Sequence, residues 1–209
     1  MYQSKLQSFI SKVQQHKSVV LVGPMAKSFP TDWPLLPVLG VDGGSNKAAP
    51  DKYDFTLGDG DSLAPALSLD LVFPVDKDAS DLALALQHLP AGPLAIHLYG
   101  FWGGRFDHQV INIGELHARL MREGGEVCFH TDSEYQVLGR PAGRHTLTLQ
   151  GLFSLFSPLP TLFSIEGSCR FPLNPTRVDT LSSRLLSNEG HGEVTLTADQ
   201  PFFCYMRKP

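Results

Sequence analysis

The sequence predicts an α/β protein in which a mostly parallel sheet with flanking helices precedes an antiparallel β-sandwich. Up to residue 132, short apolar runs of strand length alternate with segments of helical periodicity, as in Rossmann-like domains. From residue 133 onwards, short runs rich in β-forming residues are separated by Gly, Pro, Asn and Ser, which is typical of a small sandwich or barrel. We therefore predict two domains, residues 1–132 and 133–209.

Each element of the first domain follows from a local pattern. Apolar residues at helical spacing over Tyr2–Val13 predict a first amphipathic helix. Ser80 is placed to cap a second helix, and a third helix follows Arg105 and ends at the pair Gly124-Gly125. Short apolar runs predict the strands Ser18–Gly23, Val38–Val41, Asp54–Leu57, Leu71–Val75, Leu94–Tyr99 and Val127–His130.

The second domain shows strand patterns and no convincing helical period. Its charge is nearly balanced, whereas the first domain is acidic. The predicted strands are Tyr135–Leu138, His145–Leu149, Leu152–Phe156, Thr161–Ile165, Val178–Leu181, Glu193–Thr197 and Phe202–Met206.

Composition excludes several classes of function. A net charge of −4 gives no basic footprint for nucleic acid. No run approaches the ~20 apolar residues of a membrane span, and no secretion signal begins the chain. The three cysteines are far apart and lack metal-ligand spacing, which favours a reduced, cytoplasmic protein without membrane partners.

The segment Gly58-Asp-Gly-Asp-Ser62 is the first sign of chemistry. Asp59 and Asp61 follow a predicted strand, and two short carboxylates at a glycine turn suit a hard divalent cation. A surface turn is the alternative for an isolated Asp-x-Asp. Between residues 42 and 81 the chain holds nine aspartates, no glutamate and three lysines, and a solvated acidic face would mix both acids. The cluster therefore favours a cation site.

Four predicted strand ends carry polar or glycine-rich residues, at 42–46, 58–62, 76–81 and 100–108. Ligands of open parallel sheets bind beyond the carboxyl ends of the strands, so these segments are expected to meet at one edge. Gly43-Gly44 and Gly103-Gly104 let backbone amides approach phosphate oxygens, and Arg105 offers a planar fork for them. Asp107-His108 lies at a predicted helix start, where the helix dipole favours anions. Asp59, Asp61 and Asp81 are our predicted ligands for Mg²⁺.

Two common nucleotide motifs are absent from the sequence. There is no Gly-x-x-x-x-Gly-Lys-Ser/Thr loop, and no Gly-x-Gly-x-x-Gly follows the first predicted strand. These absences argue against a P-loop protein and against a dinucleotide-dependent redox enzyme.

The ordered motifs resemble those of the thiamine pyrophosphokinase family, which read approximately Asp-Gly-Gly-Ala-Asn, Gly-Asp-x-Asp-Ser, Lys-Asp-x-Thr-Asp and Gly-Gly-Arg-x-Asp-His. The matching segments here are Asp42-Gly-Gly-Ser-Asn46, Gly58–Ser62, Lys77-Asp-Ala-Ser-Asp81 and Gly103-Gly-Arg-Phe-Asp-His108 with Asn112. The resemblance implies a nucleotide-binding catalytic domain, a β-sandwich domain, and a homodimer that binds thiamine between subunits. It also implies Mg²⁺-dependent transfer of pyrophosphate from ATP to the thiamine hydroxyl, with release of AMP.

By the same resemblance, residues of these motifs take roles in the reaction. The implied catalytic residues are Asp42, Asp59, Asp61, Asp81, Arg105 and Asp107, with Asp81 or Asp107 as the group that orients or deprotonates the hydroxyl. The residues implied to bind Mg²⁺–ATP are Gly43, Gly44, Asn46, Ser62, Lys77, Asp78, Ser80, Gly103, Gly104, His108 and Asn112. For His108, support of the Arg105–Asp107 loop is an equal alternative to ligand contact.

The expected thiamine site departs from the family pattern. Family members show a Gly-Leu-x-Trp-like or Gly-Leu-x-Tyr-like stretch before their last strands, and Gly167-Ser-Cys-Arg-Phe171 stands in its place. The resemblance implies substrate contacts from Phe171, Ser187 and Asn188. The changed residues leave open a diphosphokinase for another hydroxymethylated heterocycle, such as a pterin. A metal-dependent sugar-nucleotide transferase would leave Lys77 and Arg105 without a role, and a silent binding protein is the remaining alternative.

Overall fold

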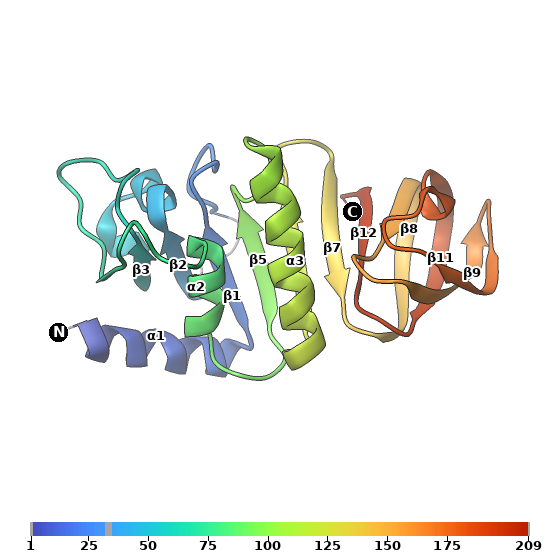
Figure 1. Cartoon of the computed structure of the whole chain (residues 1–209), viewed down its shortest axis with the longest axis horizontal. Coiled ribbons are helices and arrows are strands. Elements are labelled where there is room, and N and C mark those ends of the chain that lie inside the picture. The colour runs from blue at the N-terminus through green and yellow to red at the C-terminus, as the bar shows by residue number, and fades with distance from the viewer. Residues whose placement is uncertain (1, 32–34, 209) are drawn as a thin grey trace. The chain divides into compact units, whose positions relative to one another are not determined.

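The computed structural model describes residues 2–31 and 35–208. The chain divides into two compact units, the first ending at Glu115 and the second beginning at Leu116. This division lies within a helix, ahead of the domain boundary predicted from the sequence at residue 132. The molecule is of mixed α/β type, with a large sheet (Figure 1).

The sheet of unit 1 is parallel throughout its described pairings. Its order is β5-β1-β2-β3-β4, so β1, the first strand in the chain, lies between β5 and β2. Every residue of the three inner strands is buried, which explains their continuous apolar sequences. The bounds are β1 Ser18–Val22, β2 Val38–Val41, β3 Phe55–Gly58, β4 Leu71–Val72 and β5 Ala95–Tyr99.

Helices pack on this sheet beside the strands that they contact. Helix α1 (Tyr2–His16) packs against β1 and β3, and α2 (Asp81–His88) packs against β2 and β3 (Figure 1). The predicted cap of α2 is confirmed, because the Ser80 hydroxyl accepts a hydrogen bond from Ala83 N at 3.1 Å. Helix α3 (Phe106–Glu123) starts directly after Arg105 and ends before a glycine pair at positive φ. Short 3₁₀ helices cover Asp42–Lys47 and Pro50–Lys52.

Unit 2 is built from antiparallel strands in the order β10-β9-β11-β8-β12-β7-β6. Its core is rich in phenylalanine and leucine, including Phe153, Phe163 and Phe202, each at most 1% exposed. The bounds are β6 Glu126–His130, β7 Tyr135–Arg140, β8 Gly143–Phe156, β9 Thr161–Cys169, β10 Leu173–Val178, β11 Asn188–Ala198 and β12 Phe202–Arg207, with a 3₁₀ turn at Ser183–Leu185.

Four predicted strands differ from those observed. Strand β4 covers Leu71–Val72 only, since Pro74 has no amide hydrogen to continue the ladder. The two strands predicted at 145–149 and 152–156 form the single strand β8, which passes through Gly151 at φ 77°. The strand predicted at 178–181 is wrong beyond Val178, because β10 ends there and Leu181 has a left-handed φ of 48°.

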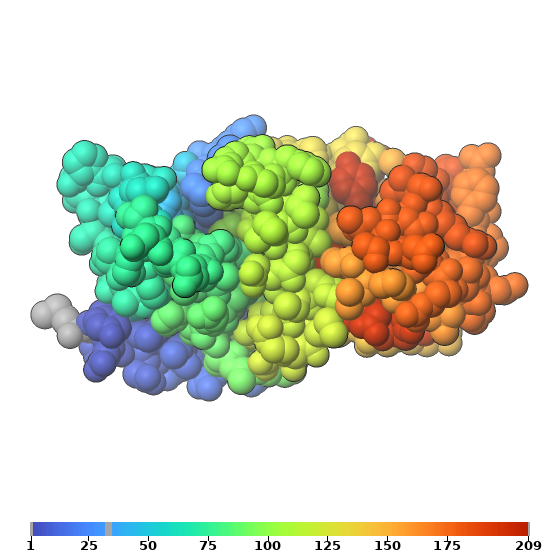
Figure 2. All heavy atoms as spheres, viewed as in Figure 1, coloured from blue at the N-terminus to red at the C-terminus, as the bar shows by residue number. Residues whose placement is uncertain are grey.

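None of the helices in the described residues is both long enough and apolar enough to span a membrane. The space-filling view shows α1, α2 and the segment between β3 and α2 on one face of unit 1 (Figure 2). The functional candidates of unit 1 lie around that segment.

Candidate functional site

The predicted site residues of unit 1 follow the carboxyl ends of its parallel strands. Asp42 comes directly after β2, Asp59 directly after β3, and the segment 100–105 follows β5. Parallel strands end at the same edge of a sheet, so segments distant in the sequence meet there. Strand β1 ends at the same edge and is followed there by Gly23-Pro24-Met25.

Two glycines allow the backbone to pack tightly at this edge. A Cβ atom on Gly44 would lie 1.9 Å from the carbonyl oxygen of Val22. A Cβ on Gly58, at φ 154°, would lie 2.8 Å from Cα of Asp42. Glycine is therefore required at both positions, and the absence of side chains brings the ends of β1, β2 and β3 together.

The conformation and burial of Asp42 are both energetically unfavourable. Its φ of 46° is left-handed, which is uncommon for a residue other than glycine, and the residue is only 6% exposed. Its Oδ1 atom is buried and accepts no hydrogen bond from the described residues. A buried carboxylate oxygen without a partner is unfavourable unless a cation or another donor reaches it.

Asp42 belongs to an acidic triple, defined as Asp42, Asp59 and Asp81. One carboxylate oxygen from each residue lies within 4.8 Å of the others. Asp61, the predicted partner of Asp59 in metal binding, is exposed and outside this triple. Its carboxylate accepts a hydrogen bond from the Ser62 hydroxyl at 2.8 Å. The two aspartates diverge because Gly58 and Gly60 at positive φ turn the chain, so the alternation of a continuing strand does not apply.

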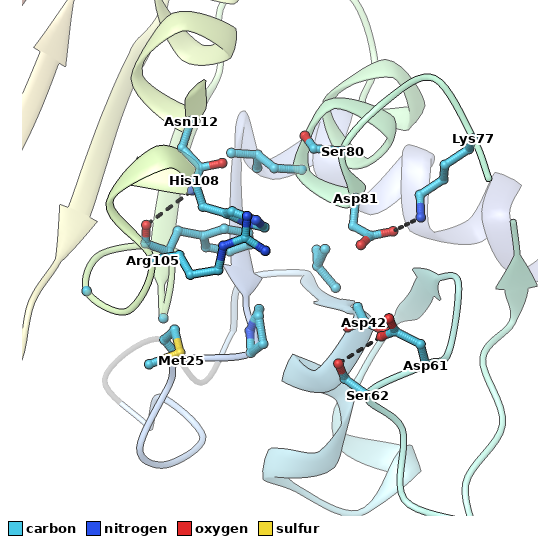
Figure 3. Close-up of a pocket in the computed structure, with 16 residues that line it drawn as sticks. Met25, Asp42, Asp61, Ser62, Lys77, Ser80, Asp81, Arg105, His108 and Asn112 are labelled. Carbon is cyan, nitrogen blue, oxygen red and sulfur yellow. Dashed lines mark hydrogen bonds and ion pairs between the residues drawn. The ribbon is translucent and has the colours of Figure 1, made fainter. Parts of the chain in front are cut away.

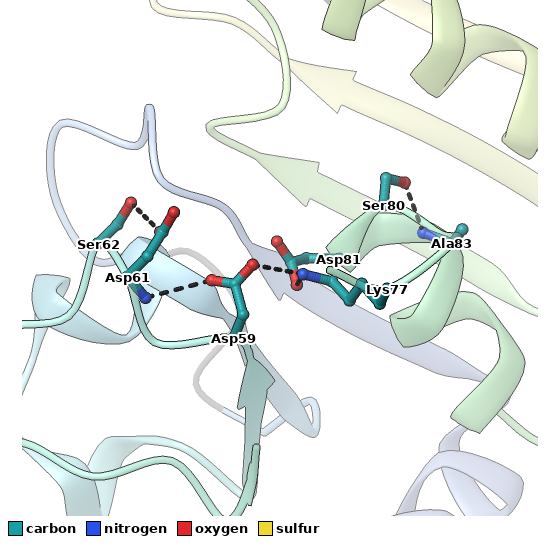
Figure 4. A network of polar contacts seen from close by, with 7 residues as sticks. All are labelled: Asp59, Asp61, Ser62, Lys77, Ser80, Asp81 and Ala83. Carbon is teal, nitrogen blue, oxygen red and sulfur yellow. Dashed lines mark hydrogen bonds and ion pairs between the residues drawn. The ribbon is translucent and has the colours of Figure 1, made fainter. Parts of the chain in front are cut away.

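Lys77 lies between two members of the triple. Its ammonium group forms ion pairs with Asp59 Oδ2 and with Asp81 Oδ1, the latter at 3.3 Å (Figure 4). The second contact is an ion pair without hydrogen-bond geometry, and Asp81 Oδ1 accepts no hydrogen bond in the described structure. Lys77 thus links the loop after β3 to the start of α2.

The pKa values of these groups follow from burial and charge. Burial raises the pKa of Asp59, but the hydrogen bond and charge of Lys77 together with hydrogen bonds from Asp61 outweigh burial, so the pKa lies below the ordinary value. Burial raises the pKa of Asp81, and the charges of Asp59 and Asp42 add to this effect against the opposing charge of Lys77. Burial would lower the pKa of Lys77, yet its contacts with Asp59 and Asp81 raise it.

A pocket of about 500 Å³ opens beside the acidic triple. Figure 3 shows the carboxylates of Asp42, Asp61 and Asp81 on one side of it, facing Arg105 and His108 on the other. The predicted site residues that line the pocket are Asp42, Asp61, Ser62, Lys77, Ser80, Asp81, Gly103, Arg105, His108 and Asn112. A cavity with acids on one wall and a guanidinium on the other suits a ligand that carries both a metal ion and phosphates.

Arg105, on the side of the pocket opposite the acids, is exposed and forms an ion pair with Asp107. Arg105 donates from Nε to Asp107 Oδ1 at 3.1 Å and from Nη2 to Asp107 Oδ2 at 2.5 Å. The hydrogen bond from Arg105 holds the pKa of Asp107 below its usual range, and the same contact raises the pKa of Arg105. Asp107 does not line the pocket, whereas Asp81 does.

Three of the predicted ligand-binding residues have structural contacts. The side chain of Asn46 fixes the loop after β3. Its Nδ2 donates a hydrogen bond to Ser62 O at 2.8 Å, and its Oδ1 accepts one from Ala64 N at 2.9 Å. Ser80 caps α2, and the side chain of Asn112 donates to Phe101 O at 3.2 Å. These bonds set the shape of the pocket walls.

Other predicted residues of unit 1 lie outside the pocket lining, and some lining residues were missed. Gly43, Gly44, Asn46, Asp59, Asp78, Gly104 and Asp107 are not among the lining residues, although Asp59 belongs to the triple. The lining residues missed were Pro24, Met25, Val41, Leu82, Gly100 and Phe101. Gly23-Pro24 after a buried apolar run was the available signal for the first two.

The predicted acceptor residues lie together in unit 2. Asn188 is 5% exposed, and its Oδ1 accepts from Phe171 N at 3.0 Å while its Nδ2 donates to Phe171 O at 2.8 Å. Phe171 is 54% exposed, and the Arg170 guanidinium lies 5.1 Å from the centre of its ring. Ser187 has a φ of 58°, and its amide donates to the Ser154 hydroxyl at 2.9 Å. Asn188 therefore holds the backbone of an exposed aromatic residue.

Comparison with known proteins identifies the fold. No protein-family model and no curated protein sequence matches the chain. The solved thiamine pyrophosphokinase from Bacillus subtilis is 22% identical, with a TM-score of 0.68 over 92% of this chain and 99% of that one. The thiamin pyrophosphokinase from Candida albicans is 13% identical, with a TM-score of 0.72 over 93% and 90% of the two chains. The chain has the fold of the thiamine pyrophosphokinases.

The yeast thiamin pyrophosphokinase extends this likeness, with a TM-score of 0.71, 14% identity and coverage of 97% of this chain and 89% of that chain. At such identities the likeness is one of fold. The likeness of fold includes both units of this chain, because the matches span nearly the whole length of both chains.

Proposed function

We propose that the chain is a thiamine pyrophosphokinase, which transfers a pyrophosphoryl group from ATP to the hydroxyl of thiamine and yields thiamine diphosphate and AMP. The observation that carries the proposal is the acidic triple, two members of which, Asp42 and Asp81, face Arg105 across a pocket at the strand ends of this fold. The motif resemblance of the same residues supports it independently of the fold.

Magnesium is the metal that this donor set fits. The triple offers only carboxylate oxygens, which hard divalent cations prefer, and Asp42 Oδ1 has no other partner in the described structure. Asp42, Asp59 and Asp81 would hold the ion, with Asp61 on the same wall of the pocket. When bound, Mg²⁺ would neutralise phosphate charge and orient the polyphosphate chain.

The proposed reaction is an in-line displacement at the β-phosphorus of ATP. The thiamine oxygen forms a bond to this phosphorus, and the bond from the phosphorus to the α–β bridging oxygen breaks, so AMP leaves with that oxygen. Lys77 and Arg105 would neutralise the phosphate oxygens. Asp81 is better placed than Asp107 to orient the hydroxyl or take its proton, since it lines the pocket and burial raises its pKa.

The remaining parts of the proposal concern the second unit and the assembly. We place the acceptor contacts at Phe171, Ser187 and Asn188, in a β-sandwich domain of residues 133–209 beside a Rossmann-like catalytic domain of residues 1–132. Thiamine would bind between the subunits of a homodimer in the cytoplasm, with no part for nucleic acid or membranes. Analytical ultracentrifugation tests the homodimer, and a monomer at assay concentration would contradict it.

The test offers two acceptors to the purified protein with Mg²⁺ and ATP. Thiamine and a hydroxymethylpterin are supplied separately, and nucleotides and products are resolved by chromatography. Thiamine-dependent formation of AMP and thiamine diphosphate is expected. Activity with the pterin alone would keep the phosphate site and overturn the acceptor, while activity with neither would favour a binding protein.

Asp59→Asn tests the metal assignment with little change in side-chain size. It removes one carboxylate charge from the triple, and we expect it to lower the transfer rate by at least ~100-fold. Asp51→Asn is the matched control, because Asp51 is an exposed residue of the 3₁₀ turn Pro50–Lys52 outside the site. Full activity of Asp59→Asn would rule out its role.

A further inference from the structure

Lys77 occupies the position of a cation within the acidic triple. Its ammonium group contacts carboxylate oxygens of both Asp59 and Asp81 (Figure 4). Only 13% of the Lys77 side chain is exposed, against 10% for Asp59 and 25% for Asp81. In this enclosed position the charges interact more strongly than a solvent-exposed ion pair would.

Lys77 does not neutralise the whole negative charge of the acidic triple. Three ionised carboxylates carry three negative charges and Lys77 supplies one positive charge, which leaves a balance of two negative charges. Asp42 Oδ1 has no hydrogen-bond partner among the described residues. The other cation of the pocket wall, Arg105, is paired with Asp107 instead. The balance equals the charge of one divalent cation.

The carboxylates that Lys77 contacts are also those that a metal ion bound to the triple would need. Any ion bound to all three members of the triple must approach the carboxylates of Asp59 and Asp81. An ammonium group and a dication at neighbouring positions repel each other, so both cannot hold these oxygens equally well. Lys77 also lines the pocket, where its charge can be directed at a ligand.

We propose that Lys77 is a resident stand-in cation that competes with the divalent metal for Asp59 and Asp81. When the metal binds, the ammonium group leaves these carboxylates and turns to the polyphosphate chain in the pocket. This inference rests on the proposed function, because it takes the triple as the metal site. Metal and polyphosphate then strengthen each other's binding, and the metal alone binds weakly.

The test measures binding of Mn²⁺ in the absence of nucleotide. Free Mn²⁺ is followed by its electron paramagnetic resonance signal at pH 8 in wild type, Lys77→Met and Lys52→Met. Loss of the competing charge is expected to tighten Mn²⁺ binding by Lys77→Met on the order of tenfold or more. Lys52→Met is the matched control, because Lys52 is exposed and outside the pocket lining, and it should bind Mn²⁺ as wild type does.

Equal or weaker binding of Mn²⁺ by Lys77→Met would overturn the proposal, since Lys77 would then support the metal site rather than compete with the metal. A second measurement covers the case in which Lys77→Met does not fold. In a crystal structure of the wild type with Mn²⁺ and a non-hydrolysable ATP analogue, Lys77 should contact the phosphates. An ammonium group still bridging Asp59 and Asp81 beside the bound metal would contradict the inference.

The proposal and the proposed function can fail separately. Tighter Mn²⁺ binding by Lys77→Met in a protein without thiamine-dependent AMP formation would support the competition and reject the acceptor chemistry. If the wild type has thiamine pyrophosphokinase activity and Lys77→Met binds Mn²⁺ with unchanged affinity, the function is supported and the competition is rejected.

Discussion

Asp42 shows most clearly how this site departs from a stable arrangement. It combines a left-handed backbone, deep burial and an unpartnered carboxylate oxygen, next to two other acids. Each of these features costs stability, and strained or uncompensated groups of this kind gather at functional sites. We therefore propose that Asp42 serves ligand binding rather than folding.

Asp42→Asn separates these two contributions. Asparagine tolerates the left-handed conformation and removes the buried charge, so the free energy of unfolding without metal should rise by about 0.5–1 kcal/mol. Pyrophosphoryl transfer should fall by at least ~100-fold. Urea unfolding in EDTA and the AMP assay measure the two effects. A clear loss of stability would contradict the view of Asp42 as an uncompensated charge.

Asn188 has the opposite character, because its side-chain oxygen and nitrogen both hydrogen-bond to the backbone of Phe171. Asn188→Ala leaves the backbone N–H and C=O of Phe171 without these partners, which should cost about 1–3 kcal/mol of unfolding free energy. Asn174→Ala, an exposed change in β10, should stay within ~0.5 kcal/mol. Urea unfolding compares them, and equal stability of both variants would show that the Asn188 contacts contribute nothing.

The sequence predicted which residues gather at the site better than it predicted their contacts. Asp42, Lys77, Asp81 and Arg105 were found because polar residues at parallel strand ends meet at one edge. The pairing of Lys77 with Asp59 depends on how closely the loops approach, which the spacing of residues does not encode. Asp61 was chosen as a metal ligand because an Asp-x-Asp at a glycine turn suits a cation, but the structure groups Asp59 with Asp42 and Asp81 instead.

At the scale of elements, the close approach of strand ends determines where the site forms. Gly44 is the tightest of these contacts, with room for no side chain beside Val22 O. Gly44→Ala is therefore expected to destabilise the protein by more than about 3 kcal/mol, because backbone must move.

Gly114→Ala is the comparison for this change. Gly114 lies within α3, and a Cβ there would meet nothing within 4 Å. Alanine has the higher helix propensity, so this variant should gain about 0.5–1 kcal/mol. Thermal unfolding of both variants measures the contrast, and a Gly44→Ala protein as stable as wild type would show that the strand ends are not tightly packed.

Strand and helix positions were predicted well where local pattern and tertiary packing agree. The buried parallel strands and the Ser80 cap are of this kind. Strand β8 was predicted as two strands because Gly151 usually marks a break, but pairing with β11 continues through that glycine. Such continuity is set by a partner strand distant in sequence and is not visible locally.

At the scale of the whole molecule, buried and partly buried histidines make stability depend on pH. Burial lowers the pKa of His97, His117 and His145 below the ordinary value of 6.5, although a backbone hydrogen bond opposes this at the last two. The unfolded chain takes up protons near pH 6.5 and the folded chain only at lower pH. Their contribution to stability is therefore complete above pH 6.5 and is lost as the pH falls through the folded-state pKa values.

We expect the unfolding free energy to decrease from pH 8 to pH 5.5, by at most about 1.4 kcal/mol per pH unit for each histidine. His117→Gln should flatten this dependence whatever its effect at pH 8, because it removes one of the groups. Urea unfolding across the pH range measures the slope. A slope unchanged by the substitution would mean that His117 does not contribute to the pH dependence.

The central claim is transfer of a pyrophosphoryl group, which follows from attack at the β-phosphorus of ATP. The most direct measurement is the product ratio from ATP, Mg²⁺ and thiamine, resolved by chromatography. We predict AMP and thiamine diphosphate in equal amounts, and neither product without thiamine. Formation of ADP with thiamine monophosphate would place the attack at the γ-phosphorus and contradict the account.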